Sequence, residues 1–95
     1  MSTYLIGEVN VNEPEKYKEY LLEVPKISAK HGGKYLVRGG NITKHEGSWS
    51  PNRLVVIEFP SRKDALDFYD GPEYAQWKEI RKKYTKSDII LVDGV

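Results

Sequence analysis

Two segments of this 95-residue chain, Arg53–Phe59 and Asp88–Val92, have the composition of β-strands and carry apolar side chains at consecutive positions. Successive side chains of a strand point to opposite faces of its sheet. A sheet that contains these segments is therefore apolar on both faces. Both faces must be covered by helices, by a second sheet or by another molecule, and this requirement limits the folds open to the chain.

The remaining elements can cover only one of these faces. Alternation, capping residues and turn residues predict two further strands and three helical segments. In chain order we expect strand Thr3–Val11, a helix from Asn12 to His31, strands Lys34–Arg38 and Arg53–Phe59, helices over Ser61–Tyr69 and Pro72–Tyr84, and strand Asp88–Val92. This βαββαβ order is that of the ferredoxin-like fold, an α+β architecture with one antiparallel sheet. No linker or repeat divides the chain, so we expect one domain over residues 1–95.

Local signals make three further predictions. Pro25 lies inside the first helical stripe, so we expect that helix to kink or break near Val24. Ser61 followed by Asp64 three residues later has the pattern of a capping box at the start of a helix. We expect Asn41–Glu46 to resume extended structure after the second strand.

The uncovered face predicts self-association. Leu54 and Val56 would point to the face opposite Val55, Ile57 and Phe59, and in the last strand Ile89 and Leu91 would lie opposite Ile90 and Val92. Each of these strands therefore carries apolar side chains on the face that the helices leave open. An exposed apolar patch of this kind usually marks an interface. A symmetric dimer with two sheets packed face to face would cover it, so we expect a homodimer. A monomer with a few exposed valines is the alternative.

Composition narrows the classes of function. Lys and Arg number 15 against 14 Asp and Glu, so no basic surplus is available to bind phosphate backbones, and we expect no nucleic-acid partner. The absence of cysteine excludes a disulfide framework and a thiolate metal site. The first residues lack a signal-peptide pattern, and no apolar run is long enough to span a membrane. We expect a cytoplasmic protein with no membrane partner.

Several short motifs, in order along the chain, resemble one protein family. They are Gly32–Gly40, Glu46-Gly47-x-Trp49, Arg53–Ser61, Ala65, Tyr69, Pro72-Glu73-Tyr74, Arg81 and Val92-Asp93-Gly94. In this order they resemble the DUF1330 family, a family of unknown function within the dimeric α/β-barrel superfamily. The resemblance covers essentially the whole chain.

That resemblance implies a ferredoxin-like protomer whose sheet packs against its partner's sheet across a two-fold axis. The paired sheets would form a dimeric α/β barrel with a cavity in each protomer. Relatives in the superfamily include cofactor-free monooxygenases, muconolactone isomerase-like enzymes and haem-binding proteins. The resemblance assigns no catalytic residue, so the candidates come from side-chain chemistry.

Glu58 and His31 are the candidates for proton transfer. Glu58 is expected on the face that a partner buries, where a carboxylate must be paired, hydrogen-bonded or protonated. It is either an acid or base, or one half of an interfacial salt bridge. His31 ends the first helical stripe, where it either caps the helix or faces a cavity as a general base. With His45 in a polar loop, the two histidines have no metal-site spacing, and we expect no metal.

Arg38, Gly39 and Gly40 are candidates for ligand binding. Glycines beside an arginine allow a ligand to approach the backbone while the guanidinium binds a carboxylate or phosphate. Alternatively, the glycines only form a bulge and Arg38 holds a partner's carboxylate. Neither G-x-x-x-x-G-K nor G-x-G-x-x-G occurs, so this segment is not a phosphate-binding loop.

Tyr74 and Arg81 complete the candidate site. With Trp77 and Tyr84 they fall on one edge of the last helix, a pattern more typical of a core than of a cofactor site. Arg81 is the exception, because an arginine buried among aromatic rings needs a carboxylate from the protein or from a ligand.

Together these features predict a homodimer that binds a small anionic or carbonyl-bearing metabolite between its sheet and its helices. If the protein is an enzyme, we expect isomerase or monooxygenase chemistry without a cofactor, since no cofactor motif is present. Glu58 or His31 would then move the proton, and Arg38 and Arg81 would hold the anion. The alternative is a non-catalytic binding or regulatory homodimer whose polar residues are interfacial. A haem-linked reaction, with His31 as axial ligand, is a third reading.

Overall fold

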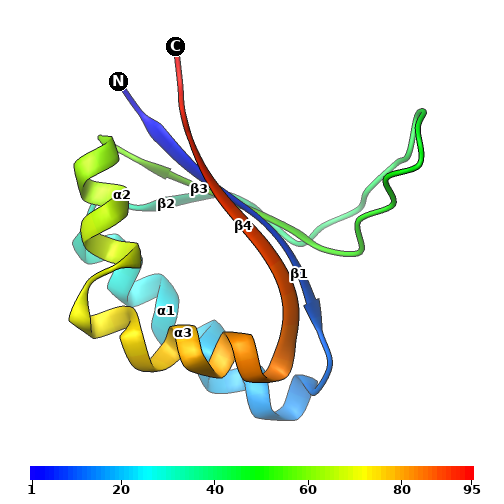
Figure 1. Cartoon of the computed structure of the whole chain (residues 1–95), viewed down its shortest axis with the longest axis horizontal. Helices are drawn as coiled ribbons and strands as arrows, with labels where there is room; N and C mark the ends of the chain where they lie inside the picture. The colour runs from blue at the N-terminus through cyan, green and yellow to red at the C-terminus, as the bar shows by residue number, and fades with distance from the viewer.

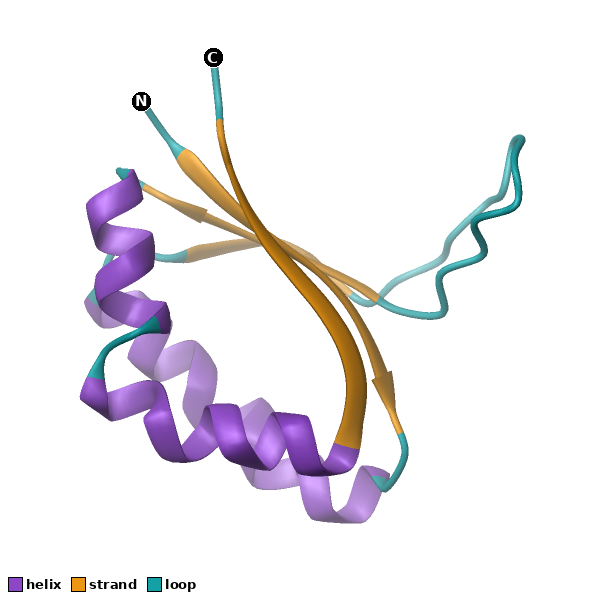
Figure 2. Ribbon diagram, in the orientation of Figure 1, coloured by secondary structure: helices purple, strands orange, loops and turns teal.

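A four-stranded antiparallel sheet with helices on one face organises the computed structural model, which describes residues 1–95 (Figures 1 and 2). The elements are β1 (Thr3–Val11), the 3₁₀ helix η1 (Pro14–Tyr17), α1 (Lys18–Lys30), β2 (Lys34–Arg38), β3 (Leu54–Phe59), α2 (Arg62–Tyr69), α3 (Pro72–Tyr84) and β4 (Thr85–Asp93). The strand order is β2-β3-β1-β4. The predicted ferredoxin-like α+β fold is confirmed.

The register of the sheet decides which side chains face the helices. Leu5 of β1 pairs with Ile57 of β3 and Leu91 of β4, so alternate residues of three strands share one face. Helices α1, α2 and α3 cover this face, and the buried cluster formed there contains Leu5, Val24, Ile57, Phe59, Ala65, Phe68 and Tyr74. The ring of Phe68 stacks on those of Phe59 and Tyr74, which ties α2 to both the sheet and α3.

No helix covers the other face of the sheet (Figure 2). Its apolar side chains stay partly exposed, with Ile90 at 57%, Val92 at 43% and Val37 at 40%. Glu58 lies on this open face as well, opposite Tyr4 of β1. The sheet is therefore apolar on both faces, as the strand patterns predicted.

The predicted break near Val24 does not occur, because α1 runs from Lys18 to Lys30 without interruption. Pro25 lacks an N–H, so the carbonyl of Leu21, four residues earlier, has no donor within the helix. The guanidinium of Arg38 in β2 donates a hydrogen bond to that carbonyl. A strand side chain thus supplies the bond that proline removes, and the helix continues.

Two other boundaries differ from the predictions. β4 begins at Thr85, directly after α3, because it pairs with β1 along its full length as far as Val11. Asn41–Glu46 forms no strand, since the segment between β2 and β3 has no neighbouring strand to pair with. This exposed loop projects away from the sheet (Figure 1). One hydrogen bond attaches the loop to β1, since the indole Nε1 of Trp49 donates to the carboxylate of Glu8 at 2.9 Å.

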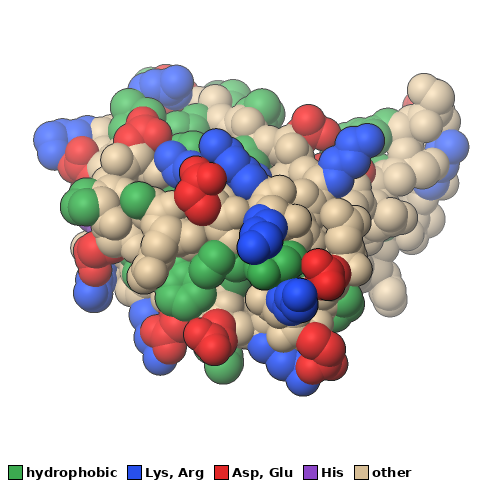
Figure 3. Space-filling view, turned by 60° about the horizontal axis from the view of Figure 1, so that its bottom comes forward, with side chains coloured by type: hydrophobic (Ala, Val, Ile, Leu, Met, Phe, Trp, Pro, Cys, Tyr) green, Lys and Arg blue, Asp and Glu red, His purple; other side chains and the backbone are tan.

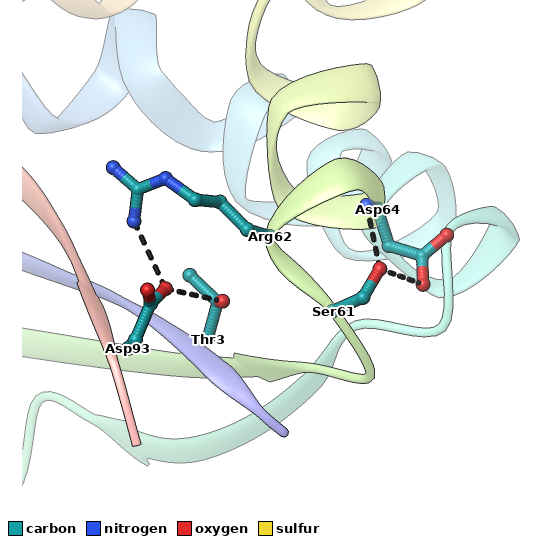
Figure 4. A network of polar contacts seen from close by, with 5 residues as sticks. All are labelled: Thr3, Ser61, Arg62, Asp64 and Asp93. Carbon is teal, nitrogen blue, oxygen red and sulfur yellow. Dashed lines mark hydrogen bonds and ion pairs between the residues drawn. The ribbon is translucent and has the colours of Figure 1, made fainter. Parts of the chain in front are cut away.

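Polar contacts join the start of α2 to the ends of β1 and β4 (Figure 4). Ser61 Oγ accepts a hydrogen bond from the Asp64 N–H at 3.1 Å, so the predicted cap is confirmed. The Asp93 carboxylate accepts hydrogen bonds from Thr3 Oγ1 and from Arg62, each at 2.9 Å. These two donors hold the pKa of the Asp93 carboxyl below its ordinary range.

The surface carries interspersed charges of both signs (Figure 3). Several form pairs within one helix, such as Lys63 with Asp67 at 2.6 Å. Exposed pairs of this kind contribute little to the stability of the fold, because water and salt screen their charges. No helix is both long and apolar enough to span a bilayer.

We expect Arg38→Ala to lower the free energy of unfolding by about 1 kcal/mol, because the Leu21 carbonyl loses its donor. In a Pro25→Ala background the backbone N–H of residue 25 can donate to the Leu21 carbonyl. Arg38→Ala should then lower the free energy of unfolding by clearly less. Urea unfolding of the wild type, both single variants and the double variant measures this coupling. Equal costs in the two backgrounds would contradict the compensating role of Arg38.

Because the pKa of Asp93 is lowered in the folded protein, we expect the free energy of unfolding to decrease at acidic pH. Its carboxylate stabilises the folded state above the unfolded pKa, at about pH 4, and this contribution is lost as the pH falls through the lower folded pKa. Arg62→Ala should therefore reduce the melting temperature at neutral pH, and the difference from wild type should shrink below pH 4. Lys44→Ala, in the exposed loop, is the control. A difference independent of pH would rule out this origin.

Candidate functional site

A partly open cavity lies between the core face of the sheet and the helices, with about 40 Å³ of room for the centre of a water molecule. Its wall is mainly apolar, but five tyrosines and three arginines contribute to it: Tyr17, Tyr20, Tyr35, Tyr69 and Tyr74, with Arg38, Arg53 and Arg81. No Asp, Glu or His side chain lines this cavity. Its chemistry is therefore cationic, phenolic and apolar.

Arg81 carries a positive charge into the protein interior. The side chain extends from α3 and the residue is only 5% exposed. Its Nε donates to the hydroxyl of Tyr74 at 3.3 Å, and its Nη2 donates to the hydroxyl of Tyr69 at 3.0 Å. Among the four arginines, Arg62 alone forms an ion pair. Arg81 is thus a buried cation with neutral partners.

The charge on Arg81 persists at neutral pH. Burial by itself lowers the pKa of the guanidinium, but the phenols of Tyr74 and Tyr69 raise it by more, and the net shift is upward. Guanidinium groups stay protonated in proteins even without such help. Arg81 lies beside the rings of Tyr69 and Tyr74, and the carboxylate that a buried arginine needs does not come from the protein.

Tyr20 and Tyr74 place two phenols beside this charge. Their hydroxyl oxygens are 2.5 Å apart, and the ring of Tyr17 stacks on that of Tyr20 with 4.4 Å between centroids. Burial raises the pKa of Tyr74 and of Tyr20, so both phenols keep their protons near neutral pH. Arg81 and these phenols together present several hydrogen-bond donors inside an apolar wall.

Arg38 and Arg53 lie at the edge of the cavity where β2 meets β3. Arg38 pairs with Val55 across the strands, and Arg53 precedes Val55 by two residues, so both belong to the core face. Arg38 is exposed, with its guanidinium 5.2 Å from the ring centroid of Tyr35. Arg53 is half-buried. Neither arginine has a carboxylate partner.

Gly39 and Gly40 shape the end of β2 and do not line the cavity. Both have left-handed backbone conformations, with φ of 76° and 89°, which glycine adopts without strain. The Gly39 N–H donates to the Leu54 carbonyl at 2.9 Å, which keeps β2 attached to β3 at this end. Direct ligand binding by these two glycines stays a prediction.

Glu58 and His31 lie outside the cavity. Glu58 is on the open face of the sheet, where its carboxylate accepts a hydrogen bond from the Tyr4 hydroxyl at 3.1 Å. His31 follows the end of α1, with its Nε2 4.0 Å from the carboxylate of Glu73. The structure thus brings Arg38, Tyr74 and Arg81 to one cavity and separates Glu58 and His31 from it. Catalytic roles for these last two residues stay predictions.

Arg53 and Tyr69 belong to the cavity although the patterns used above did not identify them as site residues. Arg53 had a usable signal, because alternation from Ile57 and Val55 places it on the same face as those two residues. Tyr69 had none. It ends α2, and only the packing of α2 against α3 brings its hydroxyl to Arg81.

Solved structures with the same fold are found at low sequence identity. RPA0582, a protein of unknown function from Rhodopseudomonas palustris, is 15% identical with a TM-score of 0.76, over 99% of this chain and 82% of that one. SnoaB, a cofactor-independent oxygenase from Streptomyces nogalater, is 11% identical with a TM-score of 0.66, over 99% and 93%. A putative antibiotic biosynthesis monooxygenase from Nitrosomonas europaea is 17% identical with a TM-score of 0.61, over 100% and 99%. These similarities establish the fold alone.

The comparison with protein families gives a match over almost the whole chain. No curated protein matches it. The family model described as a domain of unknown function, DUF1330, matches residues 2–95, in agreement with the motifs noted in the sequence. The chain therefore belongs to the DUF1330 family.

Proposed function

We propose that this protein binds a small organic anion, a carboxylate or an enolate with an apolar body, in the cavity between its sheet and its helices. The observation that carries the proposal is the buried charge of Arg81, which has two phenols but no carboxylate around it. A buried charge without a counter-ion destabilises a fold by several kcal/mol. An anionic ligand would remove this penalty when it binds.

The cavity wall has polar groups that suit the anionic group of such a ligand and apolar groups that suit its body. A guanidinium presents two parallel N–H groups that match the two oxygens of a carboxylate. The phenols of Tyr69 and Tyr74 add hydrogen bonds, and aliphatic side chains such as Leu5, Val24 and Ile57 suit a hydrocarbon or aromatic body.

A second candidate function is cofactor-independent isomerase or oxygenase chemistry at the same site. It is supported by the names of two proteins with this fold and by the phenols beside Arg81, which would stabilise an enolate as it forms. Within the cavity, a proton would pass through Tyr74. Glu58 would act only on a ligand that reaches the open face of the sheet, and His31 only on one at the end of α1. We favour binding, since no carboxylate or imidazole lines the cavity to serve as a base.

We further propose that two copies pair through the open faces of their sheets. The support is the exposed apolar surface formed by Val37, Ile90 and Val92, which would be buried against the same residues of a second copy. Glu58, bound to Tyr4 within that face, would then lie at or near the interface.

The dimer is tested by the mass in solution, which should be twice the 10.9 kDa of one chain. Ile90→Lys places a charge on the proposed interface and should shift the protein toward a single-chain mass in light scattering. Leu22→Lys, which replaces a similarly exposed leucine on α1, is the matched control and should leave the dimer intact. A wild-type mass near 10.9 kDa at all concentrations would refute the dimer.

Anion binding is tested by thermal shift of the wild type, Arg81→Met and the control Arg62→Met with benzoate, phenylacetate and hexanoate. Ligand at ten times its Kd stabilises by about 1.4 kcal/mol, which raises the melting temperature of a domain this size by roughly 6–11 °C. Arg81→Met should lose this shift while its melting temperature without ligand stays equal or rises, because a buried charge has been removed. If Arg81→Met keeps the full shift, the proposed site is wrong.

A further inference from the structure

The three arginines of the cavity occupy two separate places. Arg81 extends from α3 and is held by Tyr69 and Tyr74. Arg38 and Arg53 belong instead to the edge of the sheet, at the adjoining ends of β2 and β3. The cavity therefore has a buried cationic site under α3 and a second cationic site at its mouth.

Arg38 and Arg53 are close neighbours at this mouth. Both belong to the core face of the sheet, since one pairs with Val55 and the other precedes it by two residues. Gly39 follows Arg38 in the chain. The Nε of Arg53 lies only 3.6 Å from the position that a Cβ on Gly39 would occupy. Both arginines thus belong to the same edge of the cavity.

Nothing in the protein neutralises this pair. Arg38 donates to the carbonyl of Leu21 and packs near the ring of Tyr35, which leaves its charge unpaired. Arg53 forms no ion pair and donates no side-chain hydrogen bond, although it is half-buried. Neighbouring like charges repel, and an anion placed between them would reverse that interaction.

We infer that the ligand of this cavity is a dicarboxylate, with one acidic group bound by Arg81 and the other bound by Arg53 together with Arg38. The inference rests on the proposed anion-binding function and adds the second acidic group to it. Carboxylates are favoured because both sites present guanidinium groups, which bind carboxylates through two parallel hydrogen bonds.

The wall between the two sites indicates an apolar connection between the two acids. Tyr17 lines the cavity, and its ring stacks on that of Tyr20 with 4.4 Å between centroids. The rings of Tyr17 and Tyr35 and the side chain of Ile57 give the cavity wall flat and aliphatic surfaces. An aromatic or unsaturated carbon skeleton fits this surrounding better than a polyhydroxylated one.

The inference is tested with diacids and their own monomethyl esters, which differ only in the second charge. Isothermal titration of the wild type with isophthalate, terephthalate and adipate should give at least about tenfold tighter binding for at least one diacid than for its ester. Arg53→Gln should remove this preference while changing the affinity for the ester by less than about threefold. Arg81→Met should weaken diacid and ester together. Arg62→Gln, outside the cavity, is the control and should change neither.

The outcomes separate this inference from the proposed function. If diacid and ester bind equally well and Arg81→Met weakens both, anion binding stands and the dicarboxylate inference is overturned. A preference for the diacid that survives in Arg53→Gln also overturns it, because the second site then lies elsewhere. If the wild type binds neither diacids nor esters nor the simple monoacids, both the proposed function and the inference fail.

Discussion

The register of β1 between β3 and β4 is the constraint on which the rest of the structure depends. Pairing Leu5 with Ile57 and Leu91 assigns every residue of these strands to the core face or to the open face. A slip of β3 by one residue against β1 would exchange the faces of β3, moving Glu58 into the core and Phe59 into solvent. Both the tyrosine-lined cavity and the exposed apolar face follow from this single alignment.

The charge buried at Arg81 sets the chemistry of the cavity. An apolar side chain of similar size at that position would commonly leave a fold as stable or more stable, because a buried charge loses its hydration. The phenols of Tyr69 and Tyr74 restore some of that hydration by accepting hydrogen bonds, but they remain neutral near physiological pH. The fold therefore holds a buried arginine whose charge no carboxylate of the protein neutralises.

Arg38 links the stability of the fold to the cavity. Its guanidinium satisfies the Leu21 carbonyl that Pro25 leaves without a donor, and it also stands at the cavity mouth near Arg53. A ligand that drew Arg38 toward its carboxylate would compete with α1 for the same donor. Arg53 makes no such hydrogen bond, so its substitution should affect ligand binding with less effect on the stability of the fold than a substitution of Arg38.

The amino-acid sequence by itself determined the order of elements, the two-faced apolar sheet and the cap at Ser61, because these follow from local periodicity and side-chain chemistry. Only the tertiary structure decided that α1 passes through Pro25, since the replacement donor comes from a strand distant in sequence. It likewise decided that Tyr69 meets Arg81 while Glu58 and His31 lie outside the cavity. Such contacts depend on how helices pack over a sheet, and no periodicity within one element encodes that packing.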